Sequence, residues 1–203
     1  GEKTTYINNL YNNSTKTPVV NNSITYQYDT TNNLMQDTAG NIRYYGASPN
    51  NYIYFNCDSY PSTNCELWRI IGVFDGKIKL MRNSTIGEYS WDTSASAVNS
   101  GYGVNEWSQA DLMKLLNPGH ESESVGGSLY YNSKSGKCYS NENNVTTACN
   151  FTSTGIKNDV TRNMIAETTY NTGGWDTLDI YSNVMYEKER GTTTVSNTSD
   201  GIT

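Results

Sequence analysis

The clearest pattern of apolar and polar positions runs from Leu67 to Arg82, where two apolar runs flank the pair Asp75–Gly76. An Asp-Gly pair between strand-forming residues predicts a hairpin, because both central residues of a type I′ turn have positive φ. Counting outward from this turn predicts the pairs Phe74 with Lys77, Val73 with Ile78, Gly72 with Lys79, Ile71 with Leu80 and Ile70 with Met81. We expect the face with Val73, Ile78, Ile71 and Leu80 to be the core face, and the opposite face to be mixed.

Weaker strand patterns precede this hairpin. The runs Ile42–Tyr45 and Asn51–Asn56 are rich in strand-forming residues and are separated by a turn that contains Gly and Pro. The first forty residues are polar, with a short strand expected at Ile24–Tyr28 and a helical turn at Tyr6–Tyr11. We interpret residues 1–40 as an ordered N-terminal arm.

A clear helix pattern follows the hairpin. Ser108 is a suitable N-cap, and Asp111 stands three residues later as its capping-box partner. A helix is therefore expected from Ser108 to Leu116, where an Asn-Pro-Gly sequence ends it. We expect this helix to cover the core face of the hairpin, with Trp107 at the seam.

A second helix is expected from Ile156 to Thr169. Ile156, Val160 and Met164 are spaced four residues apart, as on the apolar side of an amphipathic helix. A Gly-Gly pair at 173–174 is expected to end it.

Aromatic residues replace aliphatic ones in this composition. Only 35% of the residues are hydrophobic and the mean hydropathy is -0.68, yet the chain has 17 Tyr and 4 Trp. These large rings can bury their bodies and keep a polar edge in water. We therefore expect a tyrosine-rich domain with a modest core.

The charge excludes one class of partner. A net charge of -6 and a pI near 4.8 argue against a nucleic-acid-binding surface, which needs clustered Lys and Arg. No run of the sequence approaches the roughly 18 apolar residues of a membrane span. The first residues lack the charged-then-apolar pattern of a signal segment, and we expect an export or anchor segment to precede Gly1.

Four cysteines form two local pairs, Cys57 with Cys65 and Cys138 with Cys149. Of the three connectivities, pairing of neighbours is favoured because each pair closes a short loop, worth about 2.5 to 3 kcal/mol. A zinc site is the alternative, but it needs tighter spacing or histidine partners, and His120 is the only histidine. Disulfides indicate an oxidising, extracellular setting, and no cofactor is expected.

Several segments together resemble a family of exported proteins of gut Gram-positive bacteria. These segments are Asn41–Cys57, Glu66–Arg82, Tyr89–Asp92 and Asn105–Asn117, and the resemblance extends from about Ile7 to Gly191. The Trp-Arg strand, the hairpin and the Trp-Ser helix start are similar to C-type-lectin-like domains related to the formylglycine-generating-enzyme fold. The resemblance implies an α+β domain over residues 41–203, with an antiparallel sheet, a central Asp-Gly hairpin and two helices. It implies no characterised activity.

The chain departs from this family at its C-terminal end. Family members continue past the position of Gly191 with further strands, more cysteines and an Arg-Pro-Val-Leu segment. The chain thus resembles a C-terminally truncated representative. Its sheet is expected to be incomplete, or to be completed by another segment such as the N-terminal arm.

The sequence offers few groups for catalysis. His120 lies in a polar loop, so a Ser or Cys nucleophile lacks an evident base. The calcium-binding tripeptides of lectins, Glu-Pro-Asn and Gln-Pro-Asp, are absent from the sequence. A glycosidase-like pair could come from four carboxylates near two tryptophans, namely Glu88, Asp92, Glu106 and Asp111. Asp111 is better explained as a capping residue.

Surface recognition by aromatic and amide side chains is the remaining chemistry. Tyr and Asn combine rigid contact area with adaptable hydrogen bonding. The expected ligand-binding residues lie in and beside the connection 83–106, and they are Tyr89, Trp91, Asp92, Tyr102 and Trp107. The alternative interpretation is that the two tryptophans are core residues.

Three functional hypotheses follow from the sequence. The leading one is a non-enzymatic, exported domain for adhesion or ligand binding at a bacterial cell surface, with a glycan or a host-surface protein as partner. The second is a structural subunit of a surface fibre or pilus that self-associates by strand addition. The third is a glycosidase-like enzyme.

Overall fold

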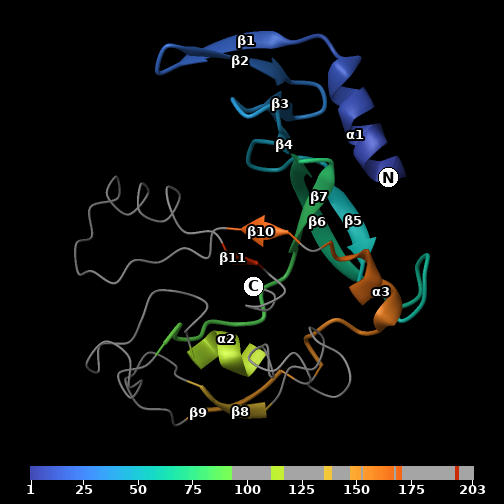
Figure 1. Cartoon of the computed structure of the whole chain (residues 1–203), viewed down its shortest axis with the longest axis vertical. Helices are drawn as coiled ribbons and strands as arrows, with labels where there is room; N and C mark the ends of the chain where they lie inside the picture. Colours follow the sequence, from blue (N-terminus) through green and yellow to red (C-terminus); the bar gives the residue numbers. More distant parts are fainter. Residues whose placement is uncertain are drawn as a thin grey trace. The chain divides into compact units, whose positions relative to one another are not determined.

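The computed structural model describes residues 1–92, 111–116, 135–138, 147–151, 153–166, 168–170 and 195–196. The chain forms two compact units, unit 1 over Gly1–Thr85 and unit 2 over Ile86–Thr203. Within the described residues the architecture is mostly antiparallel sheet with few helices, an α+β arrangement (Figure 1). The division expected after residue 40 falls inside unit 1, between two strands of one sheet.

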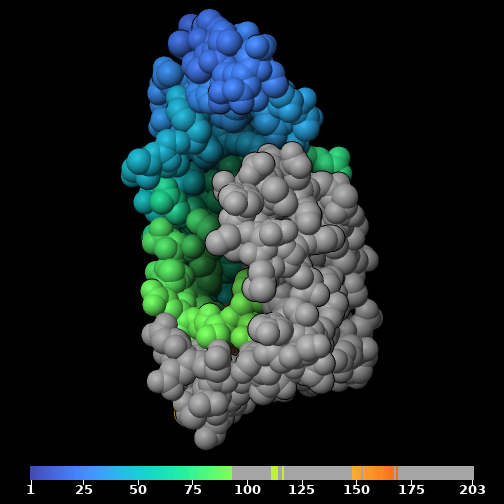
Figure 2. Space-filling model, turned by 90° about the vertical axis from the view of Figure 1, so that its left-hand side faces the viewer, coloured from blue at the N-terminus to red at the C-terminus, as the bar shows by residue number. Residues whose placement is uncertain are grey.

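Unit 1 is a seven-stranded antiparallel sheet with one helix. The strand order is β1-β2-β3-β4-β6-β5, and β7 pairs with the other edge of β6. The elements are α1 (Glu2–Asn12), β1 (Thr17–Asn21), β2 (Ile24–Asp29), β3 (Leu34–Gln36), β4 (Ile42–Tyr44), β5 (Tyr52–Phe55), β6 (Glu66–Phe74) and β7 (Lys77–Arg82). The first forty residues therefore supply three strands of the sheet rather than a separate arm. In the space-filling view their blue atoms lie directly against the cyan atoms of the residues that follow (Figure 2).

Strand β6 is the centre of this sheet. Its C-terminal half pairs with β4 and its N-terminal half with β5, so both short strands share one edge of β6. Asn51 joins them to β6: the Ile70 amide donates to the Asn51 carbonyl at 2.8 Å, and the Asn51 side-chain amide donates to the Ile70 carbonyl at 2.7 Å. The backbone carbonyl and the buried side-chain amide of Asn51 together satisfy the N–H and C=O of Ile70, which a continuous strand would otherwise pair.

Strands β6 and β7 are joined by Asp75 and Gly76, whose φ angles are 48° and 71°. Near the turn, Phe74 lies opposite Lys77, Val73 opposite Ile78 and Gly72 opposite Lys79. Beyond Gly72 the expected register was wrong, because a bulge at Ile71 shifts the pairing to Ile70 opposite Leu80 and Arg69 opposite Met81. The extra residue of a bulge keeps Ile70 and Leu80 on one face of the sheet.

The core of unit 1 lies between the sheet and α1. Its buried residues are Ile7, Tyr11, Leu34, Ile42, Ile70 and Val73. Leu10, Ile78 and Leu80 pack against them. The expectation that the Ser108–Leu116 helix covers this face was wrong: the cover is α1, whose Ile7 and Tyr11 are one helical turn apart and face the sheet together.

Unit 2 contains short elements. They are α2 (Asp111–Leu116), β8 (Ser135–Cys138), β9 (Thr147–Asn150), α3 (Asp159–Met164), β10 (Thr169–Tyr170) and β11 (Val195–Ser196), with β8 paired to β9 and β10 to β11. Phe151 is buried among Ile86, Leu112 and Leu116. A helix within the predicted range is confirmed at Asp111–Leu116, whereas its predicted start at Ser108 and the predicted stop at 117–119 lie outside the described residues.

The second predicted helix is shorter than expected. Asn158 caps α3 by accepting a hydrogen bond from the Thr161 amide at 3.1 Å, so the helix begins only after it. Thr161 is the buried residue of this helix, while Val160 and Met164 are 55% and 52% exposed. The apolar face expected from spacing was therefore wrong, and Thr169 belongs to strand β10.

The predicted disulfide between Cys57 and Cys65 is confirmed. Cys149 is also disulfide-bonded, and it lies in β9 opposite Gly136 of β8. The side chain of Cys138, its predicted partner, lies outside the described part of the chain.

Candidate functional site

Three of the five predicted ligand-binding residues are described, and two of them have structural roles. The Tyr89 ring packs edge-on against Phe151, with centroids 5.0 Å apart, and its hydroxyl donates to the Ile86 carbonyl. The Asp92 carboxylate accepts the Asp111 amide at 3.1 Å, at the first residue of α2. Trp91 is 42% exposed, and its carbonyl accepts the Leu112 amide at 3.2 Å.

The remaining residues of the loop hypothesis are not described. Tyr102 and Trp107 lie outside the described residues, as does Glu106 of the carboxylate group. The convergence of these side chains with Trp91 therefore stays a prediction. In the described part of the chain, Asp92 accepts a backbone hydrogen bond from Asp111 of α2.

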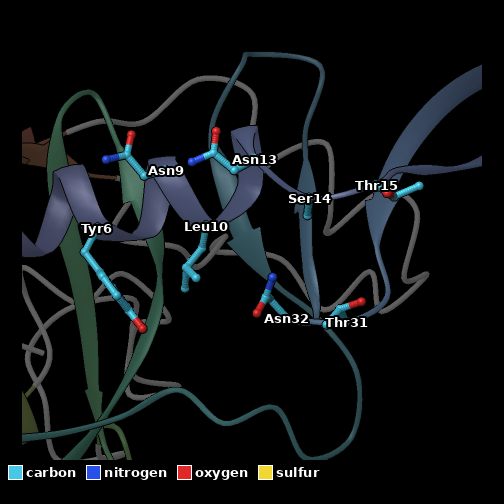
Figure 3. Close-up of a pocket in the computed structure, with 8 residues that line it drawn as sticks. All are labelled: Tyr6, Asn9, Leu10, Asn13, Ser14, Thr15, Thr31 and Asn32. Atoms are coloured by element: carbon cyan, nitrogen blue, oxygen red, sulfur yellow. The ribbon is translucent and has the colours of Figure 1, made fainter.

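Unit 1 has a shallow depression between α1 and the turn after β2 (Figure 3). It encloses about 410 Å³, and Tyr6 and Leu10 extend from one side of α1 toward Asn32. The lining residues are Tyr6, Asn9, Leu10, Asn13, Ser14, Thr15, Thr31 and Asn32. They carry amide and hydroxyl groups but no carboxylate, imidazole or thiol, so this depression offers hydrogen bonds without acid–base chemistry.

Asp29 shapes the floor of this region and is fully buried. Its carboxylate accepts the amides of Thr31 and Asn32 at 3.0 Å each and the Asn32 side-chain amide at 2.7 Å. Burial alone would raise the pKa of Asp29, but hydrogen bonds from Asn32, Ser14 and Thr31 hold it below its usual value. Asp29 therefore stays ionised and ties the turn after β2 to the end of α1.

A more distinctive surface covers the sheet face opposite α1. We call it the open face, and it consists of Arg43, Tyr52, Tyr54, Leu67, Arg69, Phe74, Lys79 and Met81. In one row Tyr52 lies opposite Arg69 and Arg69 opposite Met81; in the next row Tyr54 lies opposite Leu67. Directly opposed residues of antiparallel strands point to the same face. Their exposed fractions are 47% for Tyr52, 64% for Tyr54, 40% for Leu67 and 54% for Met81.

Arg69 is held rigidly at the centre of the open face. Its Nε donates to the Asn51 side-chain carbonyl at 2.9 Å, and its Nη2 donates to the Pro49 carbonyl at 3.1 Å. Its guanidinium carbon lies 4.8 Å from the centroid of the Tyr52 ring. These contacts use two of the five guanidinium N–H donors, leaving Nη1 and one Nη2 hydrogen for other partners.

A second part of the open face consists of the Phe74 ring and two cations that lie near it. Arg43 and Lys79 lie 4.6 and 5.7 Å from the Phe74 ring centroid. Gly72 stands between them in the sheet, and a Cβ there would lie 3.1 Å from the Phe74 ring and 2.4 Å from the Ile42 carbonyl oxygen. The absence of a side chain at Gly72 lets Phe74 lie flat over the strand.

The cations of the open face differ in their charge partners. Arg43 pairs with Asp37 at 2.6 Å. Burial would raise the pKa of Asp37, but hydrogen bonds from Arg43 and Asn41 and the charge of Arg43 hold it below its usual value. Among the described residues, neither Arg69 nor Lys79 forms an ion pair. The open face thus carries uncompensated positive charge in a chain whose net charge is -6.

Sequence reasoning predicted this face only as the mixed side of the hairpin. The signal that could have found it was the alternation Tyr52, Ile53, Tyr54 next to Leu67, Trp68, Arg69, since each strand places every second residue on one face. The apolar residues of the hairpin predicted the face with Val73, Ile78 and Leu80 as the core face, but they did not predict that α1 packs against it.

Two further findings on the described residues concern membrane-spanning helices and metal sites. No helix among them is long and apolar enough to cross a membrane. In the same part of the chain, no group of three or more His, Cys, Asp or Glu side chains is arranged to hold a metal ion.

Comparison with known proteins identifies no relative. No protein-family model matches the chain, and neither a curated protein nor a solved structure is significantly similar to it. The resemblance to exported proteins of gut bacteria therefore stays a prediction.

Proposed function

We propose that this chain is a non-enzymatic ligand-binding module of a bacterial surface protein, and that it binds through the open face. The observation that carries the proposal is an exposed patch of aromatic and apolar side chains around an arginine that is held by hydrogen bonds and ring stacking. Aromatic side chains and arginine dominate recognition surfaces, because they combine large contact area with directed hydrogen bonds.

The rigidity of the open face supports this role. Arg69 is fixed by two hydrogen bonds and by stacking on Tyr52, so little side-chain entropy remains to be lost on binding. Tyr54 presents its ring to solvent from a strand that is paired along β6. A ligand would therefore meet a preorganised surface.

The extracellular setting and the C-type-lectin-like fold belong to the same proposal. The Cys57–Cys65 disulfide supports an oxidising compartment, where such bonds persist. The lectin-like relationship is supported by the resemblance of residues 41–117.

The fibre hypothesis receives less support from the described residues. It requires a free arm or a free strand edge, but the N-terminal segment pairs within its own sheet. Of the outer strands, β1 carries Pro18, which lacks an N–H donor, and β7 carries Lys77 and Lys79, whereas β5 carries neither proline nor lysine. Proline and lysine on an edge strand oppose the addition of another strand.

An array experiment tests the proposed function. The purified chain is applied to arrays of glycans and host-matrix proteins, next to the variants Tyr54→Ala and Tyr6→Ala. Tyr6 is a matched control, because it is an exposed tyrosine of unit 1 (58%) that lines the depression instead of the open face. We expect Tyr54→Ala to lower the signal at least about fivefold, since a central aromatic contact is worth 1 kcal/mol or more.

Two results would contradict the proposal. A blank array for the unmodified chain would remove the binding function. Loss of signal with Tyr6→Ala, but not with Tyr54→Ala, would move the site to the depression.

A further inference from the structure

We propose that the open face selects carboxylate-bearing polysaccharides, and that Arg69 is the residue that binds the carboxylate. This inference rests on the proposed binding function and names its ligand class. It rests on two features of the open face that a neutral ligand would not use: cations without an ion-pair partner among the described residues, and guanidinium donors of Arg69 without a protein partner.

The first step concerns charge. Arg69 and Lys79 have no carboxylate partner among the described residues, whereas Arg43 is neutralised by Asp37. A cation that stacks on an aromatic ring, as Arg69 does on Tyr52, is partly desolvated and attracts an anion more strongly than one in bulk water. The complementary ligand therefore carries negative charge.

The second step concerns the kind of anion. The donors of Arg69 that remain free of protein partners are Nη1 and one Nη2 hydrogen, which together match the two oxygens of a carboxylate. Two unpaired cations suit a ligand whose charges are spaced more widely than those of a nucleic acid. Nucleic acid carries one charge per about 1.7 Å of duplex and needs a larger basic surface than a chain of net charge -6 provides.

The third step distinguishes a polysaccharide from a peptide. The open face lies on the flat of the sheet, where only side chains are presented, because backbone N–H and C=O groups point along the sheet plane. An extended peptide is recognised chiefly at a strand edge, through backbone hydrogen bonds. A sugar ring instead presents a C–H face, which fits against the exposed ring of Tyr54 and the side chains of Leu67 and Met81.

The test uses two polymers that share one sugar backbone and differ in whether the carboxyl groups are ionised or methyl-esterified. Binding of the full chain to polygalacturonate and to its methyl ester is measured by calorimetry at low and moderate salt, for the unmodified chain and for Arg69→Gln, Arg69→Lys, Lys79→Gln and Arg162→Gln. Arg162 is the matched control, because it loses the same charge from α3 in unit 2. Lys79→Gln leaves the hydrogen bonds between Arg69, Asn51 and Pro49 intact, so it reports on charge even if Arg69→Gln perturbs folding.

The expected result is binding of polygalacturonate and at least about tenfold weaker binding of the ester. Arg69→Gln should weaken polygalacturonate binding about tenfold or more. Arg69→Lys should weaken it less than Arg69→Gln does, because lysine keeps the charge but lacks the two parallel N–H donors that bind a carboxylate. Lys79→Gln should weaken it by about threefold, and Arg162→Gln should leave it unchanged.

Other results overturn the inference in distinguishable ways. Equal binding of both polymers would refute carboxylate selection and leave the proposed binding function standing. Tighter, Arg69-dependent binding of poly-L-glutamate or of oligothymidylate would replace the polysaccharide by a peptide or a nucleic acid. Failure of all polymers together with blank arrays would remove the binding function itself.

Discussion

The two faces of β5, β6 and β7 are built from the same alternating strands, yet they meet opposite surroundings. On one face Ile70 and Val73 are 6% and 5% exposed beneath α1. On the other face Leu67 and Met81, which are neighbours of the same strands, are 40% and 54% exposed. The difference in exposure comes from what packs on each face, because the alternation of side chains places residues on both faces in the same way.

Each face is also stabilised by a different kind of contact. The covered face is held by apolar packing against Ile7 and Tyr11, which removes its side chains from water. The open face is ordered from within, by cations stacked on Tyr52 and Phe74 and by the hydrogen bonds of Arg69. A stable scaffold on one side thus leaves an ordered surface on the other, which is what a binding module requires.

Substitution of Gly72, which lies between Arg43 and Lys79 in the sheet, is expected to have the largest effect. In Gly72→Val the new side chain would meet the Ile42 carbonyl oxygen, 2.4 Å from the Cβ position, and would displace the Phe74 ring. We expect a loss of about 4 kcal/mol in the free energy of unfolding of unit 1, from overpacking against backbone. Urea denaturation followed by tryptophan fluorescence measures it.

Gly1→Val is the control for this prediction, because no atom lies within 4 Å of a Cβ at Gly1. Equal stability of Gly72→Val and the unmodified chain would mean that β4 and β6 do not approach as closely as described.

Shortening one side chain on each face to alanine should destabilise the chain more on the core face than on the open face. Ile70→Ala removes a buried side chain beneath α1 and should lower the free energy of unfolding by about 3 kcal/mol. Leu67→Ala, three residues earlier on the same strand, should lower it by less than about 1 kcal/mol, because Leu67 is already 40% exposed. Similar losses for the two variants, measured by thermal or urea denaturation, would show that the open face is covered in solution.

Acidification should lower the stability of unit 1. The pKa values of Asp29 and Asp37 are lower in the folded chain than their usual value of 3.8. Their contribution to stability is therefore present above about pH 4 and is lost as the pH falls through the folded values. Asp29→Asn should lower the free energy of unfolding by about 1 to 2 kcal/mol at pH 7 and by less at pH 3.

Asp75→Asn is the matched control, because the Asp75 side chain is 98% exposed and Asn also tolerates the positive φ of that turn residue. If Asp29→Asn lowers the free energy of unfolding by the same amount at both pH values, the ionised state of Asp29 does not contribute to stability.

Local features of the fold were readable from the sequence. The strand at Ile24–Asp29 and the strands before the hairpin follow from the alternation of apolar and polar residues. The bulge at Ile71 was not readable, because an extra residue in one strand leaves the alternation of the other unchanged. The short extent of α3 was also missed, since Val160 and Met164 have helical spacing but face solvent.

The candidate site illustrates the same limit. Composition pointed to aromatic recognition, and the sequence places Tyr89, Trp91 and Asp92 in one loop, where Tyr89 and Asp92 make packing and capping contacts. Tyr52, Tyr54 and Arg69 come from two segments that converge only when β5 pairs with β6. No local pattern specifies such a pairing.

The sequence by itself determined which residues alternate along each strand, and hence which side chains share a face. Only the tertiary structure decided that α1, from the other end of unit 1, covers the face with Ile70 and Val73 and leaves the opposite one open. The physical reason is that alternation depends on the backbone of one strand, whereas burial depends on a packing partner distant in sequence.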